Sequence, residues 1–406
     1  MLLKDKNILV CVTGSIAVYK SLELIRLYVK AGANVKVLMT EASQRFVTKL
    51  SFEAISQNRV LDESSESWEK NQELNHIDIG KWAEVLVLAP CSANTINKIA
   101  NGIADNLLTQ TVLAFKGKKL ISPAANTNMI ENPVTLESLK KLKTLDFKII
   151  DSQIKELACK DVGNGAMAEP ETIFYETARE LLKTNYWSNR SAILSGGGTI
   201  EKIDDVRYIS NYSSGKMAAS LALALYLKGA KVSIVSTRGH ENLPLGIEKI
   251  SVQSSQQMYE DLVILTNKAK KENKKPYLFM VAAVSDYLPE NDFLGKMKKE
   301  MIGNSWKLNL KQNMDILNSI DKEGLISIGF KAEMDEVVAE ENACKMLQEK
   351  SLDGVCLNIL KDKSSFGTND NEIELILKEE SFSFSGEKGE LSLQLIEKLA
   401  QKFADE

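Results

Sequence analysis

The chain has few of the residues that usually build metal centres and disulfide frameworks. It contains two histidines among 406 residues, and its five cysteines lie far apart, at Cys11, Cys91, Cys159, Cys344 and Cys356. None of them forms a Cys-x-x-Cys pair, and an odd number cannot pair completely. These features argue against a disulfide framework and against a cysteine-based zinc site. Any cysteine chemistry must therefore come from a single thiol.

Long apolar segments and a strong excess of one charge are also missing. In the first twenty residues, MLLKDKNILVCVTGSIAVYK, charged residues and glycine interrupt the apolar runs, so we expect no signal peptide or membrane segment there. The 51 basic and 55 acidic residues give a net charge of −4, and the lysines are interleaved with acids. Nucleic acid is therefore not the favoured partner, and we expect a cytoplasmic protein.

What the sequence does contain is one α/β pattern that occurs twice. A length of 406 residues predicts two domains. In each half, short runs rich in Val, Ile and Leu alternate with helical segments, which is typical of a doubly wound parallel sheet. We place the junction in the polar stretch 181–191 and expect a lysine-rich loop at 295–306. The tail predicts a hairpin over 373–386 and a helix from about residue 391.

Two turns in the first half are candidate binding sites. Gly14 and Ser15 follow the first strand and precede a helix, where free backbone N–H groups can bind phosphate. The turn lacks the spacing of a dinucleotide-binding or P-loop motif, and an ordinary connecting turn is the alternative. Small polar residues from Ser92 to Thr95 follow a later strand and suit a ring-shaped ligand such as a flavin, although Ser92 can also cap a helix.

Other residues of the first half carry polar or reactive groups. Asn126 and Asn128 follow a strand, where an amide can hold a carboxylate or simply form a turn. Cys159 lies beside Lys160 in a glycine-rich, flap-like segment, so it is either an acid or nucleophile or an ordinary exposed thiol. His76 precedes an Ile-Asp-Ile-Gly segment that we interpret as a turn, and taken alone it is more simply a structural histidine.

The second half contains several features that suit phosphate groups. Gly196–Gly198 and Ser213–Lys216 can both present backbone N–H groups, and Lys216 can add a positive charge. Asp286 ends a strand, where it can meet a ribose or a metal-bound phosphate. A run of lysines follows at Lys296, Lys298 and Lys299, which as a charge run alone would be a solvated loop.

Four motifs together resemble one enzyme family over essentially the whole chain. These motifs are HIDIGKWA, RYISNYSSGKM, AAVSDY followed by GKMKK, and GFKAE, in that order. They resemble the bifunctional bacterial enzymes of coenzyme A biosynthesis, in which phosphopantothenoylcysteine decarboxylase is fused to phosphopantothenate–cysteine ligase. The resemblance implies a flavodoxin-like domain of the homo-oligomeric flavin-containing cysteine decarboxylase type at 1–188. It implies a Rossmann-like ligase domain at 189–406.

In the decarboxylase half, the resemblance implies FMN as the cofactor. Gly14, Ser15, Thr40 and Ser92 are the implied FMN contacts. His76 matches the family's catalytic base, Asn126 would hold the substrate carboxylate, and Cys159 would supply a proton. Oxidation at the cysteinyl thiol would give the electron pair left by carbon dioxide a place to go.

In the ligase half, the resemblance implies CTP as co-substrate and Mg²⁺ as the metal. CTP would activate 4'-phosphopantothenate as an acyl cytidylate before the cysteine amine attacks. Asn211, with Arg207 in the same loop, matches the residue tied to this intermediate, and Lys296 matches the lysine tied to its conversion. The implied nucleotide contacts are Ala282, Asp286, Lys296, Asp315, Phe330 and Lys350.

The resemblance also implies a homo-oligomer, with trimeric decarboxylase halves and dimeric ligase halves that together make a dodecamer. Ala125, Met314 and Met346 depart from the family's usual residues, which bears on affinity more than on activity. Two alternatives remain at this point. The chain could be a flavin-binding regulatory protein, or it could have kept one of the two activities.

Overall fold

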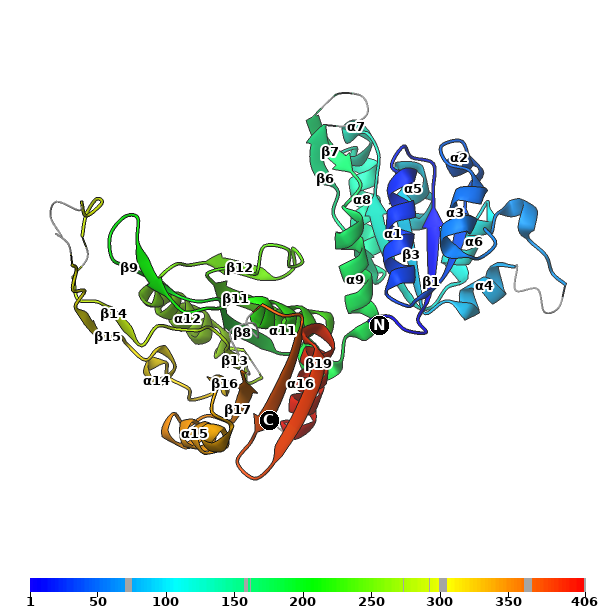
Figure 1. The fold of residues 1–406 in the computed structure, drawn as a ribbon. Coiled ribbons are helices and arrows are strands. Elements are labelled where there is room, and N and C mark those ends of the chain that lie inside the picture. Colours follow the sequence, from blue (N-terminus) through cyan, green and yellow to red (C-terminus); the bar gives the residue numbers. More distant parts are fainter. Residues whose placement is uncertain are drawn as a thin grey trace. The chain divides into compact units, whose positions relative to one another are not determined.

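The chain folds into two α/β units, Met1–Leu182 and Lys183–Glu406 (Figure 1). The structure, a computed structural model, describes residues 1–69, 75–156, 160, 162–272, 274–291, 293–298, 305–360 and 367–404. Within those residues, no helix has the length and apolar character needed to cross a membrane.

The first unit is built on a five-stranded parallel sheet. Its strands are β1 (Asn7–Val12), β2 (Asn34–Met39), β3 (Val85–Cys91), β4 (Lys118–Pro123) and β5 (Phe147–Ile149). Their order across the sheet is β2-β1-β3-β4-β5, and all neighbouring pairs are parallel. This is the flavodoxin-like order, which reverses direction between β1 and β3. Such sheets bind ligands at this reversal, beyond the carboxyl ends of the strands.

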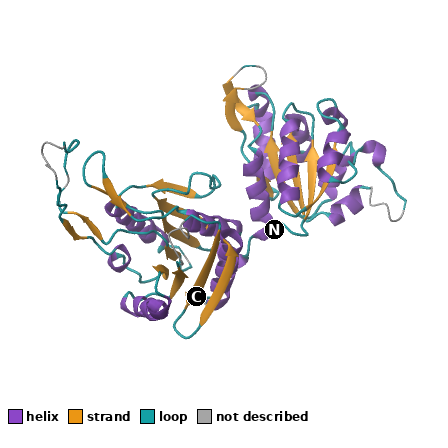
Figure 2. Ribbon diagram, viewed as in Figure 1, coloured by secondary structure: helices purple, strands orange, loops and turns teal. Residues whose placement is uncertain are grey.

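Helices cover both faces of this sheet (Figure 2). The helices on one face are α1 (Val18–Lys30), α3 (Lys49–Ser56) and α9 (Pro170–Leu182). The helices on the other face are α4 (His76–Trp82), α5 (Ala93–Ala100), α6 (Leu107–Ala114) and α8 (Pro133–Thr144). Because both faces are covered, every residue of β3 is buried, which explains its continuous apolar sequence.

Short elements shape the loops of the first unit. They are α2 (Glu41–Gln44), η1 (Glu63–Ser65), α7 (Thr127–Ile130) and an antiparallel hairpin of β6 (Gln153–Glu156) and β7 (Val162–Ala166). The hairpin packs against the turn before α7, where the Ala125 N–H donates to the Gly165 carbonyl at 3.1 Å. The loop between β6 and β7 contains Cys159, which lies outside the described residues.

The second unit contains an eight-stranded sheet. Its strands are β8 (Ser191–Gly196), β11 (Lys231–Ser236), β12 (Glu248–Ser251), β13 (Tyr277–Met280), β16 (Ile326–Glu333), β17 (Gly354–Ile359), β18 (Asp370–Ile376) and β19 (Ser381–Glu387). They lie in the order β12-β11-β8-β13-β16-β17-β18-β19. The first six are parallel and follow the 3-2-1-4-5-6 order of a Rossmann sheet, while β18 and β19 add an antiparallel edge.

The remaining elements of the second unit cover this sheet and extend from it. Helices α12 (Ser255–Ala269), α14 (Ile316–Ser319) and α15 (Glu336–Glu349) share one apolar core, and α11 (Lys216–Leu227) packs with α16 (Lys388–Lys402). Helix α10 (Asn185–Ser188) precedes β8. Two hairpins project from loops, β9 (Ile200–Lys202) with β10 (Tyr208–Ser210) and β14 (Tyr287–Pro289) with β15 (Leu310–Gln312).

The predicted fold class, a flavodoxin-like unit followed by a Rossmann-like unit, is confirmed by these strand orders. The closing hairpin is β18–β19 and the closing helix is α16, as predicted. The turn predicted after His76 is wrong, because His76 begins helix α4. Asn75 caps this helix, and its side-chain oxygen accepts hydrogen bonds from the N–H groups of Ile77 and Asp78, both at 3.0 Å.

Candidate functional site

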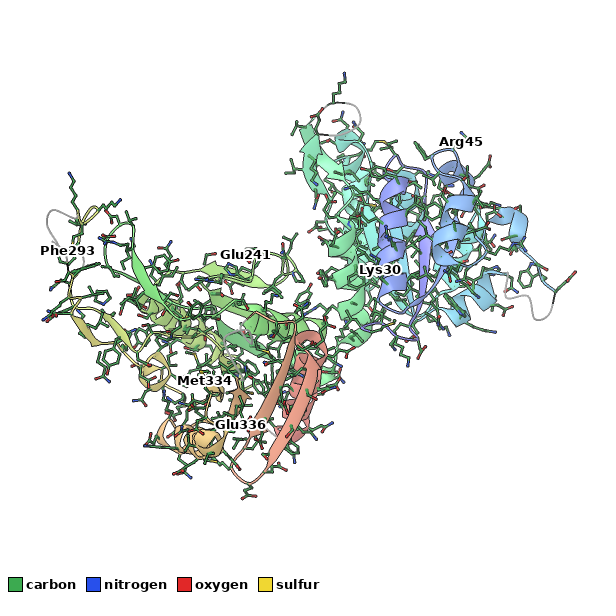
Figure 3. The ribbon with its side chains drawn as sticks, viewed as in Figure 1. Lys30, Arg45, Glu241, Phe293, Met334 and Glu336 are labelled. Atoms are coloured by element: carbon green, nitrogen blue, oxygen red, sulfur yellow. The ribbon has the colours of Figure 1, made fainter. Side chains whose placement is uncertain are left out.

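A cavity of about 1700 Å³ opens at the carboxyl ends of the strands of the first unit. Its walls come from the loops after β1, β2, β3 and β4 and from the β6–β7 hairpin. Five residues predicted from the sequence lie together in its lining: Gly14, Ser15, Thr40, Ser92 and Asn126. Arg45, labelled in Figure 3, lies at the same end of the unit and also lines the cavity. The site therefore coincides with the point where the strand order reverses.

The turn after β1 brings main chain to the cavity wall and leaves no room for a side chain at Gly14. A Cβ atom on Gly14 would lie 2.7 Å from the Cβ of Ala42, so a side chain there would push against α2. The hydroxyl of Ser15 accepts a hydrogen bond from the Ala17 N–H at 3.3 Å. Thr40 caps α2 by accepting from the Ser43 N–H, also at 3.3 Å. These contacts hold small polar groups at the rim without filling the cavity.

Ser92 has both of the roles considered for it. It lines the cavity, and its hydroxyl caps α5 by accepting from the Thr95 N–H at 3.4 Å. Its own N–H donates to the hydroxyl of Thr13 at 2.8 Å, and that hydroxyl donates to the Pro90 carbonyl at 2.9 Å. Thr13 therefore ties the ends of β1 and β3 together on either side of the reversal point.

Asn126 lies where a carboxylate in the cavity could reach it. It caps α7, with its side-chain oxygen accepting from the Asn128 N–H at 2.9 Å. The preceding turn is in close contact with β7, since a Cβ atom on Gly165 would lie 2.1 Å from the Ala125 carbonyl oxygen. A Cβ atom on Gly163 would likewise meet Thr127. The hairpin thus fixes the turn that carries Asn126.

Charged residues that the sequence analysis did not select also line the cavity. Lys20 lies 3.1 Å from a carboxylate oxygen of Glu169, and Lys155 pairs with the same carboxylate. Hydrogen bonds from Lys155 and Lys20 hold the pKa of Glu169 below its usual value. The available signal was Lys20, which lies in the same VTGSIAVYK segment as Gly14. The sequence alone does not show that Lys20 faces the cavity, because this depends on the packing of α9 against α1.

His76 does not belong to this cavity within one chain. It begins α4, and it is not among the residues that line the cavity. Figure 1 shows α4 nearer the N-terminus of the unit, whereas α2 and α7 lie toward the far end. The imidazole instead contacts Glu66, with Nδ1 3.5 Å from a carboxylate oxygen, and packs edge-on against Trp68.

The residues around the cavity fit a flavin. The volume accommodates a cofactor-sized ligand, the glycine turn lets the main chain approach a phosphate, and the rim supplies hydroxyl and amide groups for a heteroaromatic ring. The flavin also has a place at the β1–β3 reversal, where flavodoxin-like sheets bind FMN.

In the second unit, the corresponding reversal lies between β8 and β13, and Asn211 is beside it. The amide of Asn211 donates to the Val284 carbonyl at 2.9 Å. A Cβ atom on Gly198 would lie 2.5 Å from the Asn211 carbonyl oxygen. Gly197 has a positive φ of 76°, and a Cβ atom there would meet the Thr237 hydroxyl. The glycine triplet is therefore required for the tight approach of three loops.

Further predicted residues follow the carboxyl end of β13 as a connected series. Ala282 donates its N–H to the Ser195 hydroxyl at 3.1 Å. The Asp286 carbonyl accepts from the Asn313 N–H at 2.7 Å, and the Asp286 carboxylate is exposed. Asn313 also donates through its amide to the Ser285 carbonyl at 2.7 Å. Asn313 was not selected from the sequence, where it reads as an ordinary polar residue.

Asp315 and Lys350, both predicted nucleotide contacts, form an ion pair at 2.7 Å. Partial burial opposes ionisation of Asp315, but hydrogen bonds from Lys350 and the Asn318 N–H hold its pKa below the usual value. Phe330 lies half-buried on β16, in register with Cys356 of β17.

Lys296 is exposed on a loop that is anchored at both neighbouring residues. The Gly295 N–H donates to Asp205 at 2.7 Å, and the Met297 N–H donates to Asp204 at 3.2 Å. Asp204 also binds Arg207 at 2.5 Å, and this guanidinium holds the pKa of Asp204 well below its usual value. The loop that carries Lys296 is thus held beside the loop that leads to Asn211.

The charged side chains predicted to bind phosphate or metal in the second unit have different outcomes. The prediction that Lys216 adds charge to a phosphate site differs from the structure, because its ammonium donates to the Gly367 carbonyl at 2.7 Å and to the Asn369 side chain at 3.1 Å. Lys299 lies outside the described residues. Within the described ranges, no group of three or more His, Cys, Asp or Glu side chains could hold a metal ion.

The two folds and the cavity together define the class of protein. It is a two-unit α/β protein in which a flavodoxin-like unit with a flavin-sized cavity precedes a Rossmann-like unit. Residues 2–182 match the family model described as Flavoprotein, and residues 187–403 match the DNA/pantothenate metabolism flavoprotein C-terminal domain. The chain belongs to the family of coenzyme A biosynthesis bifunctional proteins. The predicted family, its enzyme class and its two linked activities, decarboxylase and ligase, are thereby confirmed.

Individual relatives show how far the similarity extends. The coenzyme A biosynthesis bifunctional protein CoaBC of Vibrio parahaemolyticus is 34% identical over 409 residues, covering 98% of this chain and 99% of that protein. The CoaBC protein of Bacillus subtilis is 36% identical over 390 residues, covering 93% and 92% respectively. A solved structure of a PPC decarboxylase mutant complexed with pantothenoylaminoethenethiol is 37% identical with a TM-score of 0.41, covering 43% of this chain and 97% of that one.

Proposed function

We propose that the chain carries out two consecutive steps of coenzyme A biosynthesis in the cytoplasm. Residues 189–406 would ligate cysteine to 4'-phosphopantothenate with CTP and Mg²⁺, and residues 1–188 would decarboxylate the product with FMN. The observation that carries the proposal is the cavity at the β1–β3 reversal, where Gly14, Ser15, Thr40, Ser92 and Asn126 meet. A purely regulatory flavin-binding protein would not need Asn126 in the lining as a clamp for a carboxylate.

In the decarboxylase half, each residue has a task that its position supports. Gly14 and Ser15 would bind the FMN phosphate, and Thr40 and Ser92 would contact the rest of the cofactor. Asn126 would donate hydrogen bonds to the substrate carboxylate until carbon dioxide leaves. When bound, FMN would supply a reversible two-electron oxidation at the cysteinyl thiol side of the substrate. Cys159 would return a proton to the product.

His76 would act as the base that removes the proton of the substrate thiol. Because His76 does not line the cavity of its own chain, we propose that a second copy supplies it. The site is incomplete without that copy, which makes a homo-oligomer a requirement of the chemistry and not only of stability. A dodecamer with trimeric decarboxylase units is consistent with this requirement.

In the ligase half, CTP would lie beyond the carboxyl ends of β8 and β13. Ala282, Asp286, Phe330 and the Asp315–Lys350 pair would contact the nucleotide, and Asn211 would hold the acyl cytidylate. Lys296 would act on that intermediate as the cysteine amine attacks. Mg²⁺ would be bound mainly by the triphosphate with a carboxylate such as Asp286, because Mg²⁺ usually combines one or two carboxylates with substrate phosphates.

One preparation of the full chain tests both halves. It should show a flavin absorption spectrum and should convert 4'-phosphopantothenate, cysteine and CTP with Mg²⁺ into 4'-phosphopantetheine, CMP, pyrophosphate and carbon dioxide. A colourless protein that leaves CTP intact would contradict the proposal.

The variant Asn211→Ala tests the division of labour. It should stop ligation but leave the decarboxylation of supplied phosphopantothenoylcysteine unchanged, because Asn211 lies in the second unit and the cavity in the first. If both activities disappear while the protein keeps its flavin and its circular dichroism spectrum, the assignment of the two halves is wrong.

A further inference from the structure

The His76 side chain lies beside a carboxylate. His76 Nδ1 lies 3.5 Å from Glu66 Oε1, a distance for an ion pair and slightly long for a hydrogen bond. The same Nδ1 is buried and has no hydrogen-bond partner among the described residues. The Trp68 ring meets the imidazole edge-on, with ring centres 5.4 Å apart and an angle of 81° between the two ring planes. Both neighbours come from the segment that follows η1.

The short helix η1, which directly precedes Glu66, is held by a set of contacts centred on Asp62. Asp62 and Ser65 form a reciprocal capping box at η1, with the Asp62 N–H donating to the Ser65 hydroxyl at 2.9 Å. The Asp62 carboxylate also accepts from Gln44 at 2.9 Å and from Lys49. Asp62, Gln44 and Lys49 all line the cavity. The carboxylate beside His76 therefore belongs to a segment that is anchored in the cavity wall.

We propose that Glu66 is a positioning residue for the catalytic histidine, an inference that rests on the proposed role of His76. A neutral imidazole has one nitrogen that donates and one that accepts. A carboxylate beside Nδ1 favours the tautomer with the proton on Nδ1, which leaves Nε2 free to accept the proton of the substrate thiol. Trp68 restricts rotation of the ring. Glu66 thus selects which nitrogen is the base without touching the substrate.

Among the residues that the structure describes around His76, the other charged groups do not duplicate this role. On its own helix, Asp78 accepts from the Asn75 amide at 2.7 Å and lies 3.9 Å from Lys81. Helix α6, which packs against α4, consists of LLTQTVLA and has no titratable side chain. Within the described part of the first unit, Glu66 is accordingly the carboxylate that faces Nδ1.

The test uses Glu66→Gln, Glu66→Asp and Glu84→Gln in the full chain loaded with FMN. Glu84 pairs with Lys6 at 2.8 Å in the same unit, so its variant controls for the loss of an ordinary surface ion pair. Glu66→Gln should reduce the kcat for decarboxylation by about tenfold or more. This loss is only a part of the roughly 10²–10⁴-fold that a general base contributes, because His76 itself is still present. Glu66→Asp should recover much of the rate, and Glu84→Gln should retain it. Ligation by the second unit should stay unchanged in all three.

Two readouts separate positioning from a structural effect. The first is rescue by Glu66→Asp, because Asp keeps a carboxylate beside the imidazole whereas Gln keeps only the size of the side chain. Histidine-selective ¹⁵N NMR should show the Nδ1–H tautomer in the parent protein and loss of that preference in Glu66→Gln. The chain has two histidines, so the resonance that disappears in His76→Gln identifies the right one.

The outcomes also distinguish failure of this inference from failure of the proposed function. If His76→Gln decarboxylates at the parent rate, the role of His76 is wrong and the inference fails with it. If His76→Gln is inactive but Glu66→Gln decarboxylates like Glu84→Gln and keeps the Nδ1–H tautomer, only the positioning role is overturned.

Discussion

Several side chains of the cavity hold the backbone that carries them. Thr40, Ser92 and Asn126 each accept a hydrogen bond from an N–H group at the start of the helix that follows. A capping side chain is confined to one orientation by its own helix, so its remaining hydrogen-bonding capacity points in a fixed direction. Small polar residues at strand ends therefore give the cavity a rigid rim, and ligand binding does not have to order it.

The Asp315–Lys350 pair allows a test of electrostatics at residue scale. The folded pKa of Asp315 lies below the unfolded value of about 3.9, so the pair contributes stability above that pH and loses it as pH falls through the folded pKa. Lys350→Met should lower the free energy of unfolding of the second unit by at most about 1 kcal/mol at pH 7, because both side chains are partly exposed.

Urea denaturation at two pH values measures this effect. The difference between the parent and Lys350→Met should shrink at pH 3, where Asp315 begins to be protonated in both proteins. Lys345→Met is the control, since Lys345 forms an exposed pair with Glu349 one helical turn away. A loss for Lys350→Met that is equally large at pH 3 and at pH 7 would mean that packing, and not charge, explains it.

Single residues can be predicted from the sequence when the residues directly before and after them indicate a binding role. The Gly14–Ser15 turn and Ser92 follow apolar strands and could be selected directly, and the structure places them in one cavity. Lys155 and Glu169 could not be selected, because their relevance depends on how the β6–β7 hairpin and α9 return to α1. The ammonium of Lys216 could not be placed either, since its acceptors lie about 150 residues further along the chain.

Among the elements, the β6–β7 hairpin controls the cavity most directly. It packs on the turn before α7 through two glycines, and Gly165 has both a positive φ of 146° and no room for a Cβ atom. The hairpin was expected only as a flap-like segment, because its strands are short and do not alternate between apolar and polar residues. Helix α4 was missed for a related reason, since Gly80 in a short segment suggests a turn.

Gly165→Ala tests whether the hairpin positions Asn126. The new methyl group would lie 2.1 Å from the Ala125 carbonyl oxygen, so the turn must shift. A displacement on the order of 1 Å should reduce decarboxylation on the order of 10²-fold, while ligation stays unchanged. Substrate turnover by both units in the same preparation provides the measurement.

Gly386→Ala is the matched control for this prediction. Gly386 has a similar φ of 133°, but a Cβ atom there would meet nothing within 4 Å. It therefore carries the backbone strain of a left-handed residue without the steric contact. If Gly165→Ala and Gly386→Ala lose decarboxylation activity equally, general destabilisation explains the result and the hairpin has no specific role.

For the whole molecule, two different α/β topologies each have predicted residues beside the reversal of their strand order. In the first unit these residues line the cavity at the reversal between β1 and β3, and in the second unit Asn211 lies beside the reversal between β8 and β13. The sequence predicts the alternation of strands and helices, but it does not state strand order, which depends on long-range pairing. The tandem repeat of the α/β pattern still sufficed to predict two units, because each half contains enough apolar strands for its own sheet.

The position of His76 makes a prediction about assembly that can be tested by mixing two inactive chains. His76 does not line the cavity of its own copy, so co-expressed Asn126→Ala and His76→Gln chains should form sites with the cavity of one and the histidine of the other. Random assembly should restore about a quarter of the parent decarboxylation rate. Replacing the His76→Gln chain by the Asn126→Ala, His76→Gln double variant should restore none, because every cavity in the mixture then lacks Asn126. If the two single variants also remain inactive together in isolated mixed oligomers, cavity and histidine must act within one copy, and α4 would have to move to the cavity.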